Sequence, residues 1–135
     1  MTRKELEKVY YLKRELKTWE RRHEELLADM AQDSVSNDGL PHSITNNINR
    51  PTENKAILIA DHADLIRGKL AEIRLAIREV EAFIVNIEDP LTRHIVELRC
   101  VYCMTWEEVA ATIGTSNTAE NARQIYCRFL KDNLS

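Results

Sequence analysis

Two short clusters in the sequence hold residue types that bind metals or transfer protons. Cys100 and Cys103 have the separation of a zinc knuckle or redox pair, and His94 and Cys127 could complete a ligand set. We expect no metal there, because the pair falls inside a predicted helix and no second Cys/His pair stands at ligand spacing. Reduced cysteines buried between helices are the preferred interpretation, since free cysteine is among the most often buried residue types.

The second cluster is the segment Asp61-His62-Ala63-Asp64. Its three polar side chains occupy positions i, i+1 and i+3 of a predicted helix, so they spread over a wide arc instead of converging. A solvated helix face explains them. The sequence also has no phosphate-binding glycine loop and no nucleophile motif. We therefore predict a protein that is not an enzyme, without catalytic residues, metal or cofactor.

A more informative pattern begins at Thr105, which can cap a short helix while Glu108 reaches back to the cap's own N–H. Gly114 supplies the left-handed residue that ends this helix. Its apolar face consists of Val109, Ala110 and Ile113. After a polar turn, a second amphipathic helix carries Ala122, Ile125, Tyr126 and Phe129 at helical spacing. This pattern predicts a helix-turn-helix, which usually presents its second helix to the DNA major groove.

These two helices resemble region 4 of sigma-70-type factors. The family pattern W/S-x-E-E-I-A-x-x-L-G matches Trp106-Glu107-Glu108-Val109-Ala110 with Ile113-Gly114, and E-R-x-R-Q-I matches Glu120-Asn121-Ala122-Arg123-Gln124-Ile125. With its long helical N-terminal part, the whole chain is similar to small sigma-like regulators of phages and prophages in Gram-positive bacteria, the RinA/ArpU type of late-gene activator. The resemblance implies a DNA-binding transcriptional regulator that also contacts host RNA polymerase, through its acidic helices or through Glu107 and Glu108.

The turn between the two helices departs from the sigma pattern. The distance from Gly114 to Arg123 is two residues longer here, so either Ser116 or Thr118 caps the second helix. Thr118 is favoured, because the apolar residues of the second helix then fall where the sigma pattern buries them. The residues left on the outward face are Ala119, Glu120, Arg123 and Gln124.

The resemblance assigns roles to the second helix. Arg123 would pair with guanine, Gln124 with adenine, and Glu120 would accept a hydrogen bond from cytosine. Thr118, Arg128 and Lys131 would contact phosphates and position the helix. The predicted DNA-binding residues are Thr118, Glu120, Asn121, Arg123, Gln124, Arg128 and Lys131.

Charge limits the strength of that binding. The 19 Lys and Arg and 22 Asp and Glu residues give a net charge of −3, which is not typical of a strongly basic nucleic-acid binder. Residues 121–131 nevertheless hold Arg123, Arg128 and Lys131 without an acidic residue. We therefore expect modest, salt-sensitive binding to double-stranded DNA.

The N-terminal two thirds of the chain is periodic. A capping box of Thr2 and Glu5 precedes a heptad seam formed by Val9, Leu12, Leu16, Trp19, His23, Leu26 and Met30. Residues 33–52 are rich in Ser, Asn, Asp and Pro and predict a mobile loop. Thr52 and Glu53 then start a second heptad helix, with Ala56, Ile59, Ala63, Ile66, Leu70, Ile73, Ile77, Val80, Ile84 and Ile87 on its seam.

These patterns predict an all-α fold with two domains. Residues 1–88 would form a long, coiled-coil-like antiparallel helical hairpin, and 89–135 a three-helix helix-turn-helix unit whose first helix runs from Pro90 to about Cys103. Leu58, Leu65, Leu75 and Phe83 lie off the seam. Because a two-helix hairpin buries itself poorly, we expect a homo-oligomer formed through the hairpin. The alternative is that the helix beginning at Pro90 and the rest of the C-terminal unit cover these apolar residues.

The expected location is the bacterial host cytoplasm, since no apolar run approaches the roughly 18 residues of a membrane span. Two other classes of protein remain open. Small terminase subunits, which recognise DNA for phage packaging, also combine a helix-turn-helix with oligomerising helices, although their DNA-binding unit usually comes first. The other class is an interaction protein whose helix-turn-helix binds protein.

Overall fold

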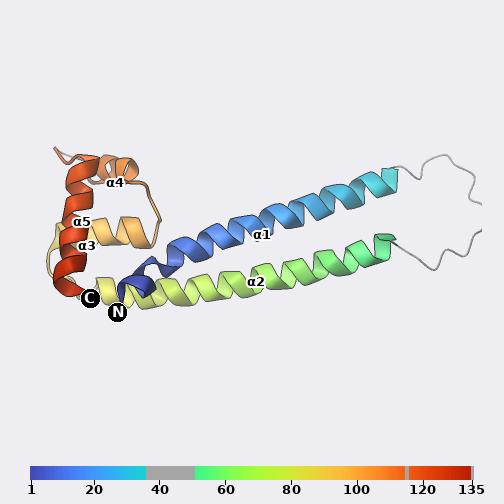
Figure 1. Ribbon diagram of the computed structural model, residues 1–135, viewed down its shortest axis with the longest axis horizontal. Helices are drawn as coiled ribbons and strands as arrows, with labels where there is room; N and C mark the ends of the chain where they lie inside the picture. Colours follow the sequence, from blue (N-terminus) through green and yellow to red (C-terminus); the bar gives the residue numbers. More distant parts are fainter. Residues whose placement is uncertain (36–50, 115, 135) are drawn as a thin grey trace, which may run out of the picture. The chain divides into compact units, whose positions relative to one another are not determined.

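The computed structural model describes residues 1–35, 51–114 and 116–134, and within these ranges the chain is helical with no strand. The elements are α1 (Arg3–Val35), α2 (Pro51–Ile84), α3 (Pro90–Cys100), α4 (Trp106–Ile113) and α5 (Ala119–Asn133) (Figure 1). The predicted all-α class is confirmed. Most of the expected mobile loop 33–52 lies outside the described residues, and α1 and α2 extend a few residues into its two ends. None of the described helices has the length and apolar character needed to cross a membrane.

Internal contacts divide the chain into two compact units. One, here called the core unit, contains Met1–Arg14 and Ala71–Ser135, and the other, the paired-helix unit, contains Glu15–Leu70. The core unit therefore includes the first turns of α1 and the last turns of α2 together with α3, α4 and α5.

The paired-helix unit is held by contacts between α1 and α2. Trp19 and His62 meet edge to face with ring centroids 5.4 Å apart, and Lys69 Nζ lies 3.0 Å from Glu15 Oε1. In α1 of this unit, the half-buried positions are the predicted seam residues Leu16, Trp19, His23, Leu26 and Met30. On α2 the seam residues Ile59, Ala63, Ile66 and Leu70 are half-buried, whereas Ala56 is exposed.

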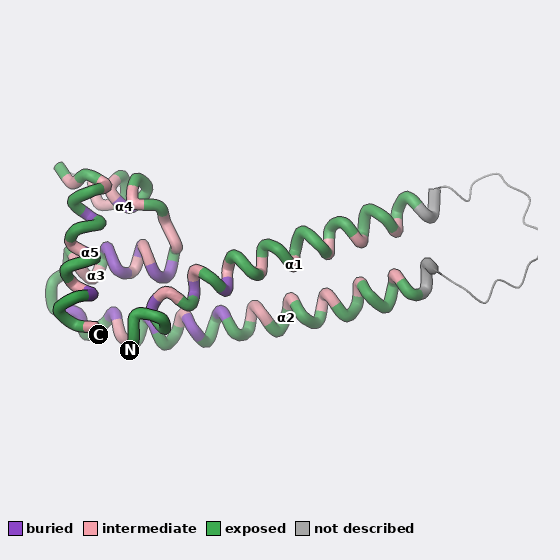
Figure 2. Tube along the Cα trace, viewed as in Figure 1, coloured by how far each residue is buried: buried purple, intermediate pink, exposed green. Residues whose placement is uncertain are grey.

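The core unit contains every buried apolar side chain of the described residues. Figure 2 shows these buried positions on α3 and α5 and on the parts of α1 and α2 that belong to this unit. The largest fully buried side chains are Leu6, Val9, Val80, Ile95, Val96 and Val109. No polar or charged side chain is buried in the part of the chain that the structure describes. This apolar core fixes how α3, α4 and α5 pack on one another.

Helices α1, α3 and α4 begin directly after the residues that the sequence predicts as caps, whereas α2 begins at Pro51, one residue before its predicted start. Thr2 and Glu5 form a complete capping box, in which each backbone N–H donates to the other side chain at 2.6 and 3.2 Å. Asp89 accepts the Thr92 N–H at 3.0 Å, just before Pro90. The start of α4 is capped by Thr105, whose hydroxyl accepts the Glu108 N–H at 3.3 Å.

The turn before α5 uses Thr118, not Ser116, as its cap. The Thr118 hydroxyl oxygen accepts the Asn121 N–H at 3.2 Å. Gly114 ends α4 with φ at +73°, the positive value that favours glycine. The favoured register of the second helix is therefore confirmed, with Ala122, Tyr126 and Leu130 buried and Ile125 and Phe129 half-buried.

The predicted end of α3 at about Cys103 is wrong, because the helix stops at Cys100. Cys103 adopts a positive φ of 56°, which breaks the helical path. The Val101 carbonyl, at the C-terminal end of α3, instead accepts a hydrogen bond from Lys13 Nζ at 2.6 Å. This donor comes from α1, so the spacing within α3 could not reveal it.

The expectation that all three cysteines pack between helices holds only for Cys100. Its thiol is buried and lies 3.5 Å from the Tyr126 hydroxyl. Cys103 is half-buried and Cys127 is exposed, because Cys127 lies one residue beyond the buried Tyr126 on α5. Burial raises the pKa of Cys100 to about 11, so this thiol stays protonated at neutral pH.

Candidate functional site

A cluster of aromatic and sulfur-containing side chains packs against the buried side of α5. Tyr126 packs against Trp106 of α4 with ring centroids 5.3 Å apart, and its hydroxyl contacts Cys100 of α3. The Arg99 guanidinium carbon stands 4.6 Å above the Trp106 ring. Side chains of α3, α4 and α5 thus meet in a defined arrangement that fixes the orientation of α5.

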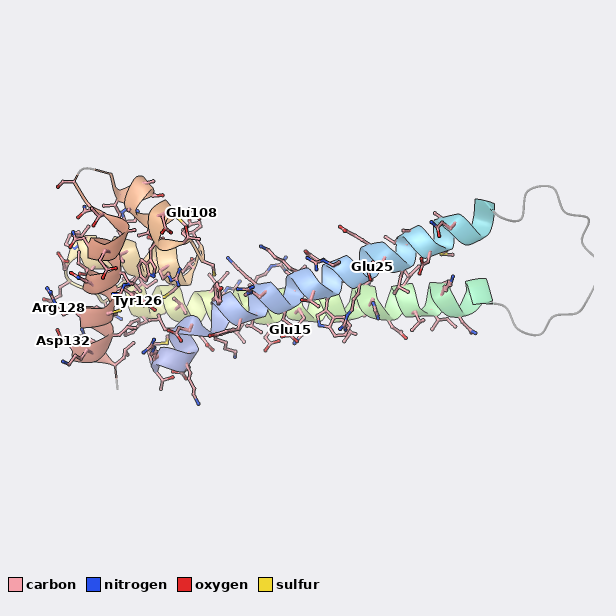
Figure 3. All side chains as sticks on the ribbon, turned by 45° about the horizontal axis from the view of Figure 1, so that its top comes forward. Glu15, Glu25, Glu108, Tyr126, Arg128 and Asp132 are labelled. Atoms are coloured by element: carbon pink, nitrogen blue, oxygen red, sulfur yellow. The ribbon has the colours of Figure 1, made fainter. Side chains whose placement is uncertain are left out.

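The seven residues predicted to bind DNA are all exposed on or just before α5, namely Thr118, Glu120, Asn121, Arg123, Gln124, Arg128 and Lys131. The buried side of the helix carries Ala122, Tyr126 and Leu130. In Figure 3, Arg128 and Asp132 project from the side of α5 opposite to Tyr126. The helix thus presents a continuous polar face to solvent.

Glu120 brings together the two side chains predicted to read bases. Arg123 donates to its carboxylate from Nη2 at 2.6 Å and from Nε at 3.1 Å. Gln124 Nε2 donates to the same carboxylate at 3.5 Å. The hydrogen bond from Arg123 lowers the pKa of Glu120, and the same bond raises the pKa of Arg123. Both groups are therefore ionised over the whole neutral range.

Two of the predicted residues are also engaged in the turn that starts α5. The Thr118 hydroxyl serves as the helix cap. Asn121 Nδ2 donates to the Asn117 side-chain oxygen at 2.9 Å. These bonds fix the first turn of α5, so any ligand meets a helix start with a defined geometry.

Arg123 and Arg128 lie beside different cavities. Arg123 and Cys127, four residues apart, share one flank of α5 and line a cavity of about 340 Å³ together with residues of α1, α3 and α4. Arg128 lines a second cavity of about 670 Å³ formed with α2, α3 and the segment between them. Hydrogen bonds to Glu120 therefore group Arg123 with Gln124, whereas Arg123 and Arg128 lie on different flanks of α5.

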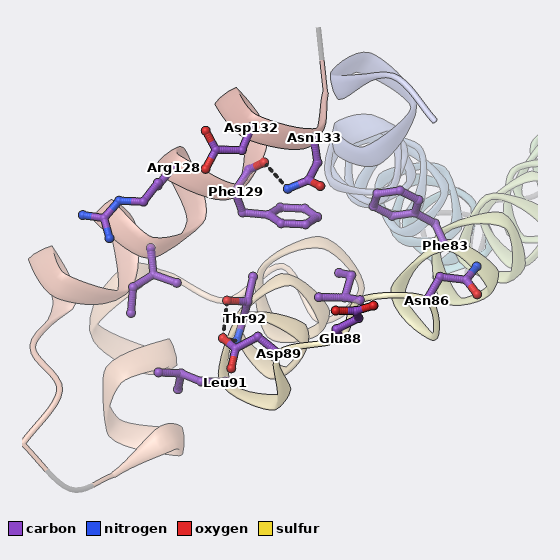
Figure 4. A pocket seen from close by; sticks show the side chains of 12 residues that line it. Phe83, Asn86, Glu88, Asp89, Leu91, Thr92, Arg128, Phe129, Asp132 and Asn133 are labelled. Atoms are coloured by element: carbon purple, nitrogen blue, oxygen red, sulfur yellow. Dashed lines mark hydrogen bonds between the residues drawn. The ribbon is translucent and has the colours of Figure 1, made fainter.

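The second cavity has an aromatic floor and an acidic rim (Figure 4). Phe83 of α2 and Phe129 of α5 face each other with ring centroids 6.1 Å apart. Of the rim carboxylates, Asp89 accepts two hydrogen bonds from Thr92, from its N–H at 3.0 Å and its hydroxyl at 2.6 Å. These bonds lower the pKa of Asp89, which therefore acts as an ionised helix cap and is a poor general acid.

Neither sequence cluster suggestive of metal or acid–base chemistry converges in space. In the Asp61–Asp64 cluster, His62 packs edge to face against Trp19, while Asp64 pairs with Arg67 at 2.8 Å. The His62 Nδ1 atom is buried and has no hydrogen-bond partner. Within residues 1–35, 51–114 and 116–134, no three His, Cys, Asp or Glu side chains are grouped so that they could hold a metal ion.

Sequence reasoning missed the contribution of α1 to the surroundings of α5. Arg3, Glu7 and Tyr10 line the same cavity as Arg123 and Cys127. The available signal was Leu6, which lies three residues before Val9 and extends the apolar seam into the first turn. Leu6 is 0 % exposed, and its burial brings the first turn of α1 into the core unit.

Comparison of the chain with protein-family models, curated proteins and solved structures finds no match. Function is therefore inferred from the residues of this chain. The strongest basis for inferring a function is the exposed polar face of α5, because the Thr118 cap and the buried residues of α5 indicate the same helical register.

Proposed function

We propose that the protein is a sequence-specific, DNA-binding transcriptional regulator of phage or prophage genes. In this proposal α4 and α5 form the helix-turn-helix and α5 enters the major groove. One observation carries the proposal: α5 starts at the Thr118 cap, buries Ala122, Tyr126 and Leu130, and leaves its predicted DNA-binding side chains exposed. The sequence resemblance to sigma region 4 supports the same residues.

The proposed roles follow from side-chain chemistry. Arg123 donates two hydrogen bonds to guanine, and Gln124 pairs with adenine. Glu120 has two functions, because it orients Arg123 in the free protein and can accept a hydrogen bond from cytosine in the complex. Thr118, Arg128 and Lys131 contact phosphates and position the helix, with Asn121 at the helix start.

Self-association belongs to the same proposal. No described side chain of the paired-helix unit is buried, and Leu58 and Leu65 of α2 are 47 % and 46 % exposed. These two leucines are seven residues apart, so they lie on one line along the helix. A second copy of the proposed hairpin would cover them. In this proposal, residues 1–88 form the predicted assembly domain and residues 89–135 the predicted DNA-binding domain.

Contact with host RNA polymerase is the third part of the proposal and rests on the resemblance. Glu107 and Glu108 at the start of α4 are exposed, so an acidic surface is available for a basic region of the enzyme. Replacing both by glutamine should reduce transcription activation without changing the affinity for duplex DNA. Equal losses of transcription activation and of duplex affinity would assign these residues to DNA binding.

The test of DNA binding is a titration of labelled duplex DNA at several salt concentrations. Each protomer should neutralise about two to four phosphates, which gives a shallow dependence of log affinity on log salt. No duplex binding at low salt, with and without polymerase, would refute the proposal. Rings of eight or more subunits in solution would instead favour a small-terminase-like role in DNA packaging.

A further inference from the structure

Three arginines from three different helices line one cavity of the core unit. They are Arg3 of α1, Arg99 of α3 and Arg123 of α5, around a volume of about 340 Å³ here called the arginine cavity. Its lining contains one acidic residue, Glu7. The three arginines, Glu7 and the Glu120 carboxylate that is paired with Arg123 together leave +1 at this place, in a chain whose net charge is −3. The local excess of arginine favours an anionic ligand.

The three guanidinium groups differ in how firmly they are held. Arg99 donates to the Met104 carbonyl at 2.7 Å and lies over the Trp106 ring, so protein groups fix its orientation. Arg3 is paired with Glu7 at 3.0 Å, where the two side chains are 65 % and 33 % exposed. Arg123 is paired with Glu120 at 2.6 Å and is also solvent-exposed. Exposed ion pairs contribute little to stability, so an incoming anion can replace either carboxylate.

Phosphate is the anion that suits such a group of arginines. A guanidinium offers parallel N–H donors that match two phosphate oxygens, and charge-assisted bonds of this kind are strong. The position of Arg123 indicates where the phosphate comes from, because Arg123 borders both the arginine cavity and the outward face of α5. A duplex lying along α5 would therefore bring its backbone beside Arg3 and Arg99.

We propose that the arginine cavity receives a backbone phosphate of the duplex bound by α5, so that Arg3 in the first turn of α1 is part of the DNA interface. The inference rests on the proposed function. Arg3 and Arg99 bind the phosphate, and Arg123 lies between the cavity and the face of α5 that enters the major groove. The N-terminal turn of the chain thereby gains a role in DNA affinity, although it lies 120 residues before Arg123 in the sequence.

The first experiment replaces Arg3 by glutamine and measures duplex affinity against salt. The loss of one phosphate contact should weaken binding to all sequences by about fivefold to tenfold at 0.1 M salt, and it should flatten the salt slope by about one. Arg21→Gln is the matched control, because Arg21 is an exposed arginine of the same helix outside the cavity lining, and it should change neither quantity.

The second experiment uses the unmodified chain, so it does not depend on the folding of a variant. Cys127 is exposed and lines the arginine cavity, whereas Cys103 is half-buried and outside it. Saturating duplex should slow alkylation of Cys127 at least fivefold and leave the rate at Cys103 unchanged. Inorganic phosphate and ATP are tested in parallel. Protection of Cys127 by either of these, without protection by duplex, would overturn the DNA assignment and identify a small phosphate ligand.

The outcomes separate the two proposals. A chain that binds no duplex refutes the proposed function and this inference together. A chain that binds duplex while Arg3→Gln keeps the parental salt slope, or while Cys127 stays unprotected, refutes only the inference about the cavity.

Discussion

The two units of this protein contain the same kind of sequence pattern but differ in how far they bury it. Heptad seams run through both α1 and α2. In the core unit the seam residues Val9, Leu12, Ile73, Val80 and Ile84 are buried. In the paired-helix unit every described seam residue is half-buried or exposed. A heptad pattern therefore identifies the inward face of a helix, while the number of neighbouring helices decides how much of that face is covered.

The difference has an energetic consequence. Complete burial of a leucine or isoleucine side chain contributes about 1.5–3 kcal/mol relative to full exposure, and partial burial contributes correspondingly less. Stability should thus be concentrated in the core unit, where α3, α4 and α5 pack on one another beside the ends of α1 and α2. The paired-helix unit has less stability of its own and gains more from a partner.

The largest expected effect is the difference in unfolding free energy when the same substitution is placed in each unit. Leu6→Ala removes a side chain with 0 % exposure and should cost about 2–5 kcal/mol in the free energy of unfolding. Leu26→Ala, on the same helix but half-buried, should cost about 1 kcal/mol. Urea unfolding followed by circular dichroism measures both values. Equal costs at the two positions would contradict the proposed difference in stability.

Alkaline pH should weaken the core unit through Cys100. Burial raises its pKa from 9.0 to about 11 in the folded chain. Because folding raises this pKa, the contribution of the protonated Cys100 thiol to stability is complete below pH 9 and is lost as the pH rises toward 11. The loss amounts to about 2 kcal/mol in the free energy of unfolding. The difference in unfolding free energy between the parent and Cys100→Ala should therefore narrow over this range. A constant difference would show that the thiol is accessible to water.

The smallest effect on folding is expected at the exposed leucines of the paired-helix unit. Replacing Leu58 and Leu65 by glutamine should change the unfolding free energy of the isolated chain by less than about 0.5 kcal/mol per site, because both side chains are about half exposed. The mass measured by light scattering should nevertheless fall, because these leucines form the proposed contact between copies. An unchanged oligomer would assign assembly to another surface.

Local chemistry explains why so much of the fold could be predicted. Capping depends on residues three positions apart, so Thr2, Asp89, Thr105 and Thr118 could all be recognised from their neighbours. The seams depend on a repeat of seven residues, which is also local. The end of α3 was missed because Lys13, 88 residues away, donates to the Val101 carbonyl. The arginine cavity was missed for the same reason, since it joins Arg3 to Arg99 and Arg123.

The central claim is that α5 reads DNA in the register set by the Thr118 cap. The most direct test is the selection of binding sites from random duplexes by the parent, Arg123→Ala and Lys131→Ala. Arg123→Ala should relax the preference at one base position and bind the parental site roughly 10-fold to 100-fold more weakly. Lys131→Ala should select the parental motif while it weakens all sequences about equally and flattens the salt slope by about one. If Arg123→Ala selects the parental motif at every position, α5 does not read DNA in this register.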